Sequence, residues 1–137
     1  MNKFSHFLGI DVSKDSFDAW LIDVKQNKHL DEKFNIDSDG FDLLVERLKK
    51  YNPKSILTIL ESTGVYHINL FFQLDEKGFK TAIVNPLLIH NFNKSVTLRK
   101  SKTDKIDAFR IACFTLHNHN NIELKNASSP SIRSLIR

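Results

Sequence analysis

The order of the apolar runs is the feature that most constrains the fold of this chain. Residues 4–12 contain the apolar run Phe7-Leu8-Gly9-Ile10, and residues 17–24 and 29–36 form two more β-type runs after short polar turns. A near-continuous apolar run is typical of a strand buried on both faces, so we expect the first strand to be central. The short links predict an antiparallel meander, with the third strand at an edge of the sheet.

Helical and β-type segments alternate through the rest of the chain. Predicted helices span residues 38–51, 66–77 and 103–118, and predicted strands span residues 55–60 and 81–84. Gly78 is expected to follow the second helix as its C′ residue. This order predicts an RNase H-like α/β fold, in which a mixed five-stranded sheet of three antiparallel and then two parallel strands is flanked by helices.

The length of 137 residues suits one compact domain, which we assign to residues 1–127. Residues 128–137 begin a further helix with apolar residues on one face. A helix this short does not hold by itself in water, so we expect the chain to be the N-terminal part of a longer protein.

Cysteine content and hydropathy indicate the cellular compartment of the chain. The single cysteine, Cys113, cannot form an internal disulfide, which favours the reducing cytoplasm, and its apolar neighbours favour a core position. No apolar run reaches the roughly 20 residues of a membrane-spanning helix, so no membrane association is expected. His117 and His119 lack a partner motif and are weak metal-site candidates.

Charge is divided unevenly along the chain. Residues 1–77 carry ten Lys and Arg against thirteen Asp and Glu, whereas residues 78–137 carry ten against three. A basic second half indicates a polyanionic partner such as nucleic acid, and a merely solvated surface is the alternative.

Four carboxylates are candidates for a shared site. Asp11 lies in the apolar setting of the first strand, and Glu61 leaves the other predicted central strand. Asp104 and Asp107 are three residues apart and so share a face of the first turn of a helix. The alternatives are a strand-end hydrogen bond for Asp11 and favourable interaction with the helix dipole for the pair.

Neighbouring carboxylates repel one another unless a cation is shared between them. Hard oxygen ligands in this number favour Mg²⁺ or Mn²⁺ over zinc. Two such ions can activate a nucleophile and stabilise the leaving oxygen of a phosphodiester. Lysine and arginine side chains near these acids are candidates to bind phosphates, and the alternative is that they lie in a solvated loop. They are Lys14, Lys94, Arg99, Lys100, Lys102 and Lys105.

Three motifs carry a family resemblance. The segments Gly9-Ile10-Asp11-Val12-Ser13-Lys14, Leu60-Glu61-Ser62-Thr63-Gly64-Val65-Tyr66 and Lys102-Thr103-Asp104-Lys105-Ile106-Asp107-Ala108 resemble the signatures of the DEDD transposases. These are insertion-sequence recombinases related to Piv-type invertases and understood as guided by a bridge RNA. The resemblance extends over essentially the whole chain.

The resemblance implies a RuvC-like N-terminal domain whose four acids, Asp11, Glu61, Asp104 and Asp107, bind divalent metal for DNA strand cleavage and transfer. It also implies DNA and a structured guide RNA as partners and a homo-oligomer in the full-length form. Family members carry a second domain with an attacking serine, to which nothing in this chain corresponds. The roles of Ser13, Ser62 and Thr63 beside the acids stay open.

Other functions remain as alternatives. The chain could be a stand-alone RuvC-type Holliday-junction nuclease, or a non-catalytic module for nucleic-acid binding or assembly. A sugar-kinase or actin-like ATPase also begins with a strand ending Gly-Ile-Asp, but the turn at residues 12–15 lacks the glycines of a phosphate loop.

Overall fold

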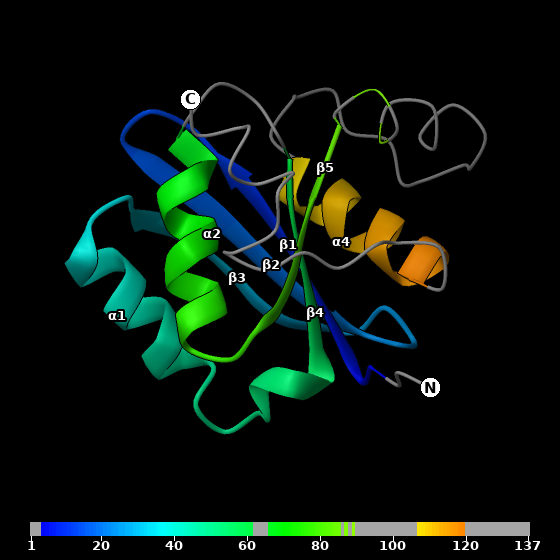
Figure 1. The fold of residues 1–137 in the computed structure, drawn as a ribbon. Coiled ribbons are helices and arrows are strands. Elements are labelled where there is room, and N and C mark those ends of the chain that lie inside the picture. Colours follow the sequence, from blue (N-terminus) through cyan, green and yellow to red (C-terminus); the bar gives the residue numbers. More distant parts are fainter. Residues whose placement is uncertain (1–3, 62–65, 86, 88, 90–106, 120–137) are drawn as a thin grey trace.

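A mixed five-stranded sheet forms the centre of the molecule in the computed structural model, which describes residues 4–61, 66–85, 87, 89 and 107–119 (Figure 1). The strands are β1 (His6–Val12), β2 (Ser16–Asp23), β3 (Lys28–Asn35), β4 (Ile56–Glu61) and β5 (Lys80–Val84). The helices are α1 (Ser38–Arg47), α2 (Tyr66–Glu76) and α4 (Asp107–Asn118), and a short 3-10 helix, η1 (Pro53–Ser55), precedes β4. The spatial order β3-β2-β1-β4-β5 makes β1 the central strand.

The strand pairing is the one expected from the sequence. β1 pairs with β2, and β2 with β3, in antiparallel fashion, whereas β4 is parallel to both β1 and β5. The predicted meander, the central first strand and the edge position of the third strand are therefore confirmed. α1 ends at Arg47, before the predicted end at Tyr51. The chain forms turns after Arg47, and in one of them the Tyr51 amide donates a hydrogen bond to the Leu48 carbonyl.

The two faces of the sheet carry separate cores. Leu8 and Ile10 of β1 pack in one buried cluster with apolar side chains of α1 and α2, including Leu44 and Leu70. Phe7, which alternates with them along β1, packs instead with buried side chains of α4. Alternation along a strand sends successive side chains to opposite faces. Odd-numbered residues of β1 therefore face α4, and even-numbered residues face α1 and α2.

Capping hydrogen bonds define the start of α1 and the end of α2. The Asp37 carboxylate accepts a hydrogen bond of 2.8 Å from the Gly40 amide, so Asp37 is the N-cap of α1, and the helix begins at Ser38 as predicted. Gly78 has a φ of +92°, and the Phe79 amide donates to the Leu74 carbonyl while the Gly78 amide donates to the Asp75 carbonyl. These are the two bonds of a Schellman motif, which confirms Gly78 as the C′ residue.

Several predicted features fall outside the described residues. These are the basic segment from residue 90 to 106, the helix predicted from residue 128 and the boundary predicted at residue 127. Among the helices that the structure describes, none is long and apolar enough to cross a membrane.

Candidate functional site

Asp11 and Glu61 lie at adjacent positions on the two central parallel strands. The parallel register of β1 and β4 pairs Gly9 with Ile59 and Ile10 with Leu60, and Asp11 and Glu61 are the next residue on each strand. Neighbouring strands are about 4.8 Å apart. Both carboxylates are partly exposed, whereas Ile10 and Leu60 are fully buried. The sheet therefore brings together two acids that are fifty residues apart in the sequence.

Both acids belong to the face that α4 covers. Asp11 alternates in step with Phe7, and Glu61 with Leu57, and both of these apolar residues pack in one cluster with Ala112 and Cys113 of α4. On this face of each strand, the acid is therefore the residue that follows the last apolar side chains of the core.

A further carboxylate on this face, Asp18, was not a candidate in the sequence analysis. The antiparallel register of β1 and β2 pairs Asp11 directly with Asp18, and residues that are opposite in such a ladder share a face. The Asp18 carboxylate lies 3.8 Å from the ammonium of Lys33, its register partner on β3. Four polar side chains therefore cross the sheet in one row: Lys33, Asp18, Asp11 and Glu61.

The turn between β1 and β2 is the signal that could have located Asp18. The Ser13 amide donates to the Ser16 carbonyl at 2.8 Å, and this tight turn pairs Val12 with Phe17. Counting outward from such a turn gives the register of a hairpin, and with it the partner of Asp11.

α4 brings Asp107 toward the same row. Asp107 is the first residue of α4, and the backbone of the next residue, Ala108, lies against Gly9 of β1, two residues before Asp11. The position of the Asp107 carboxylate and all of Asp104 fall outside the described residues, so the structure joins Asp11, Glu61 and the start of α4 but does not test the complete set of four.

The donor chemistry of the row fits a hard divalent cation. Carboxylate oxygens are the ligands preferred by Mg²⁺ and Mn²⁺, and adjacent carboxylates repel one another without a cation. Within the described part of the chain, no group of three or more His, Cys, Asp or Glu side chains is arranged to hold a metal ion. Completing a site would fall to Asp104 and Asp107, as the sequence predicts.

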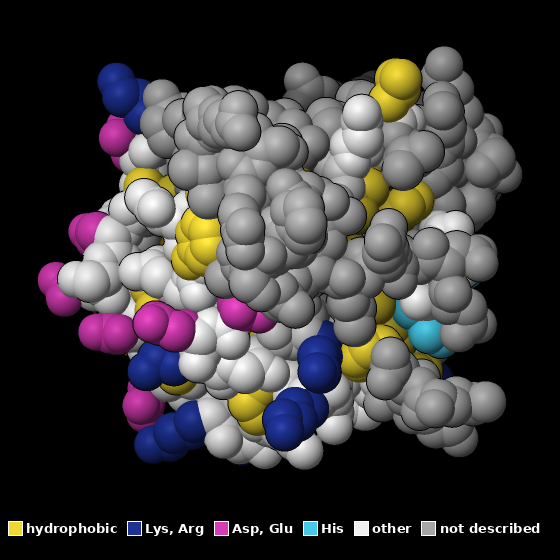
Figure 2. Space-filling model, viewed as in Figure 1, with side chains coloured by type: hydrophobic (Ala, Val, Ile, Leu, Met, Phe, Trp, Pro, Cys, Tyr) yellow, Lys and Arg dark blue, Asp and Glu magenta, His cyan; other side chains and the backbone are white. Residues whose placement is uncertain are grey.

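Few of the predicted nucleic-acid contacts lie in the described part of the chain. Lys14 is exposed in the turn that follows β1. The Ser13 hydroxyl in the same turn donates to the Ser16 carbonyl at 3.0 Å. Ser62, Thr63, Lys94, Arg99, Lys100, Lys102 and Lys105 are outside the described residues. On the face shown in Figure 2, described lysine and arginine side chains lie mainly in the lower part, with others at the upper left.

Two of the weaker candidates, Cys113 and His119, make contacts typical of structural residues. Cys113 is completely buried, and burial raises the pKa of its thiol to about 11, which disfavours the reactive thiolate. The His119 ring packs at 5.4 Å from the ring of Phe7, and its Nδ1 lies 2.9 Å from the Leu116 carbonyl oxygen.

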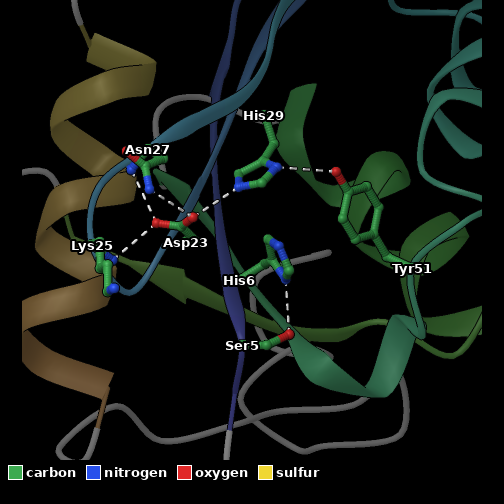
Figure 3. Close-up of polar contacts among 7 residues, drawn as sticks. All are labelled: Ser5, His6, Asp23, Lys25, Asn27, His29 and Tyr51. Atoms are coloured by element: carbon green, nitrogen blue, oxygen red, sulfur yellow. Dashed lines mark hydrogen bonds and ion pairs between the residues drawn. The ribbon is translucent and has the colours of Figure 1, made fainter.

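A second polar cluster, which the sequence did not predict, lies at the start of β1, at the other end of the strand from Asp11 (Figure 3). Asp23 accepts hydrogen bonds from the Lys25 and Asn27 amides and lies 2.9 Å from Nε2 of His29, whose Nδ1 lies 3.3 Å from the Tyr51 hydroxyl. The His29 contact and then the Asn27 amide hold the pKa of Asp23 well below its usual value. Burial, and secondarily the charge of His29, lower the pKa of the neighbouring His6. This cluster joins the β2–β3 turn to the segment after α1.

The sheet order, the parallel step from β1 to β4 and a helix packed across these two strands define an RNase H-like fold of the RuvC type. A solved structure, T. thermophilus RuvC in complex with a Holliday junction substrate, matches with a TM-score of 0.62 at 10% identity, over 88% of this chain and 99% of that one. The expected fold class is confirmed.

The chain belongs to the DEDD transposase family of the IS110 type, because the family model, described as transposase, matches residues 8–137. Two curated relatives, the pilin gene-inverting proteins of Moraxella lacunata and Moraxella bovis, are each 36% identical over 108 residues, which are 77% of this chain. The chain spans about a third of the length of these relatives, since the match covers 33% of each.

Proposed function

We propose that this chain is the metal-binding catalytic domain of a DNA recombinase that acts in transposition, either site-specific or guided by a structured RNA. Asp11, Glu61, Asp104 and Asp107 would hold Mg²⁺ or Mn²⁺. The observation that carries the proposal is the register of β1 and β4, which makes Asp11 and Glu61 neighbours on the face covered by α4.

Each acid has a defined part in this proposal. Asp11 and Glu61 come from the rigid centre of the sheet and supply oxygen ligands whose positions are set by strand pairing. Asp107, the first residue of α4, and Asp104, three residues before it in the sequence, would supply the remaining ligands, and α4 packs over the same strands. When bound, a divalent cation supplies Lewis-acid stabilisation of the charge that develops on a phosphodiester during strand cleavage.

The partners follow from charge and family. Lys14 and the basic residues Lys94, Arg99, Lys100, Lys102 and Lys105 would contact phosphates of DNA or of a guide RNA, which makes binding sensitive to salt. The pilin gene-inverting proteins are named for inverting a gene, an activity on DNA that supports DNA as a partner of this chain. The complete recombinase would add a second domain with an attacking serine and would assemble as a homo-oligomer.

Mutation of the two described acids tests the proposal. In the longer protein that carries this domain, Asp11→Asn or Glu61→Gln should reduce recombination at least a hundredfold without lowering the thermal unfolding midpoint of the domain. Asp31→Asn is the control, because Asp31 is an exposed carboxylate on the same face of the sheet, where it pairs with Lys28 at 3.6 Å, and it is outside the proposed metal site. Full recombination by an Asp11→Asn, Glu61→Gln double variant would refute the proposal.

A second candidate function is that of a stand-alone junction nuclease. The specific observation in its favour is that this chain covers 99% of the length of a RuvC that was solved with a Holliday junction. Incubating the chain by itself with four-way DNA junctions and Mg²⁺ separates the two functions. Cleavage that is lost in Asp11→Asn favours the nuclease, whereas intact junctions favour the recombinase domain.

A further inference from the structure

Gly9 is the place where α4 approaches the sheet most closely. A Cβ atom on Gly9 would come within 3.0 Å of backbone atoms of both Ala108 and Ala112, a separation that real Cβ atoms essentially never show. The obstacles are a carbonyl oxygen and an amide nitrogen of the helix backbone, so no side-chain rotation could relieve the overlap. Any residue other than glycine would therefore push α4 away from β1.

This contact lies between two of the acids assigned to the candidate site. Gly9 is on the α4 face of β1 and Asp11 is the next residue on that face, while Ala108 directly follows Asp107 at the start of α4. On the helix, Ala108 is one residue from Asp107. On the strand, Gly9 is two residues from Asp11. Adjacent to the contact, Phe7, Leu57, Ala112 and Cys113 form a buried cluster that holds the helix in place.

We propose that Gly9 is a positioning residue for the metal site, an inference that rests on the proposed function. By lacking a side chain, Gly9 lets the start of α4, which carries Asp107, approach the strand that carries Asp11, and cation binding by the site depends on this approach. Ordinary van der Waals contact begins at 3.4 Å, so a methyl group on Gly9 makes the start of α4 withdraw by at least several tenths of an ångström. Mg²⁺ requires near-ideal octahedral geometry at about 2.0–2.1 Å, which a displaced ligand cannot satisfy.

The test compares two glycines that are both crowded by backbone atoms but lie on opposite sides of the sheet. Gly40 in α1 is also crowded by backbone, that of Asn35 in this case, but it belongs to the opposite side of the sheet, where Phe41 and Leu44 of α1 are buried. Mn²⁺ binding to the folded chain is measured by titration calorimetry, with thermal unfolding recorded for each variant. Gly9→Ala should weaken Mn²⁺ binding by roughly tenfold or more, the range typical of residues that orient metal ligands. Gly40→Ala should bind Mn²⁺ as the wild-type chain does, although it too loses stability.

A double-mutant cycle with Asp107→Asn separates positioning from general destabilisation. If Gly9 acts through Asp107, the loss of Mn²⁺ affinity caused by Asp107→Asn becomes smaller in the Gly9→Ala background. Additive losses would overturn the inference. Should Gly9→Ala not fold, Ala112→Ser enlarges a fully buried side chain of α4 in the cluster beside this contact and should weaken Mn²⁺ binding in the same sense; unchanged binding there overturns the inference.

The outcomes also separate this inference from the proposed function. A wild-type chain that binds no Mn²⁺ overturns the proposed metal site and the role of Gly9 with it. A wild-type chain and a Gly9→Ala variant that bind Mn²⁺ equally overturn the role of Gly9 and leave the metal site standing.

Discussion

Asp18 lies directly opposite Asp11 in the antiparallel ladder between β1 and β2, and its carboxylate is 3.8 Å from the ammonium of Lys33. Asp11 therefore has a carboxylate neighbour on each side, Asp18 on β2 and Glu61 on β4. Three adjacent negative charges on one face of a sheet attract a cation and repel one another in its absence. This relationship makes Asp18 a natural object of mutation.

Asp18→Asn should weaken divalent-cation binding and relieve charge repulsion in the metal-free chain. Removing one charge lowers the attraction for Mn²⁺, so we expect a several-fold rise in the Mn²⁺ dissociation constant. Asp18→Asn and Asp31→Asn each lose an ion pair with a lysine, but only Asp18→Asn relieves cross-strand repulsion, so without metal its free energy of unfolding should be higher than that of Asp31→Asn by roughly 0.2–1 kcal/mol. Titration calorimetry and urea unfolding check the two effects. Asp31→Asn is the control, and equal Mn²⁺ binding by Asp18→Asn and Asp31→Asn would contradict the expectation.

The cluster around Asp23 should contribute stability that depends on pH. The pKa of Asp23 is lower in the folded chain than in the unfolded chain, chiefly through His29, so the folded state is favoured at any pH above the unfolded value of about 3.9. This contribution is lost as pH falls from about 5 toward the folded pKa. Urea midpoints between pH 7 and pH 3 should therefore fall less steeply for Asp23→Asn than for the wild-type chain.

His29→Gln provides the companion measurement, because the His29 contact is the largest cause of the lowered pKa of Asp23. In His29→Gln the urea midpoint should also fall less steeply between pH 7 and pH 3 than in the wild-type chain. Combining His29→Gln with Asp23→Asn should reduce this pH dependence little further. A full-sized additional effect in the double variant would show that the two residues act separately.

Gly78→Ala should destabilise the chain although there is room for the methyl group. No heavy atom lies within 4 Å of a Cβ placed on Gly78, so the cost comes only from its φ of +92°. A left-handed backbone costs a residue with a side chain about 1–2 kcal/mol. Thermal unfolding should show a lower midpoint for Gly78→Ala than for Lys77→Ala next to it, and equal midpoints would be inconsistent with this account.

Cys113 should resist thiol reagents until the chain unfolds. Its side chain is fully buried in the cluster between the sheet and α4, and the pKa of its thiol is raised to about 11. Modification by a disulfide reagent at pH 8 should proceed at the rate of unfolding and should accelerate in urea. Rapid labelling of the native chain would place the thiol at the surface instead.

The sequence predicted the fold well because its signals are local. The apolar run at Phe7–Ile10 indicates a strand buried on both faces, and Gly78 marks the end of a helix through its conformational freedom. Among the described residues, the elements differ from the prediction at their ends, as where α1 ends at Arg47 instead of Tyr51, because end positions depend on a few weak local contacts.

The candidate site was predicted only in part. Asp11 and Glu61 stand out as charges that follow apolar runs, whereas Asp18 alternates with apolar neighbours in the way of any half-exposed strand residue. The cluster of His6, Asp23, His29 and Tyr51 joins residues from three segments and leaves no periodic pattern in the sequence.

By itself, then, the amino-acid sequence determined which segments become strands and helices, their order and the acids that interrupt the apolar runs, since these depend on neighbours within a few residues. Only the tertiary structure decided which charges meet. Strand register made Asp18 the partner of Asp11 and set Asp11 beside Glu61, and the missing side chain of Gly9 let α4 pack closely against β1. Such contacts depend on packing between distant segments, where a shift of one residue in register would turn every one of these side chains to the other face.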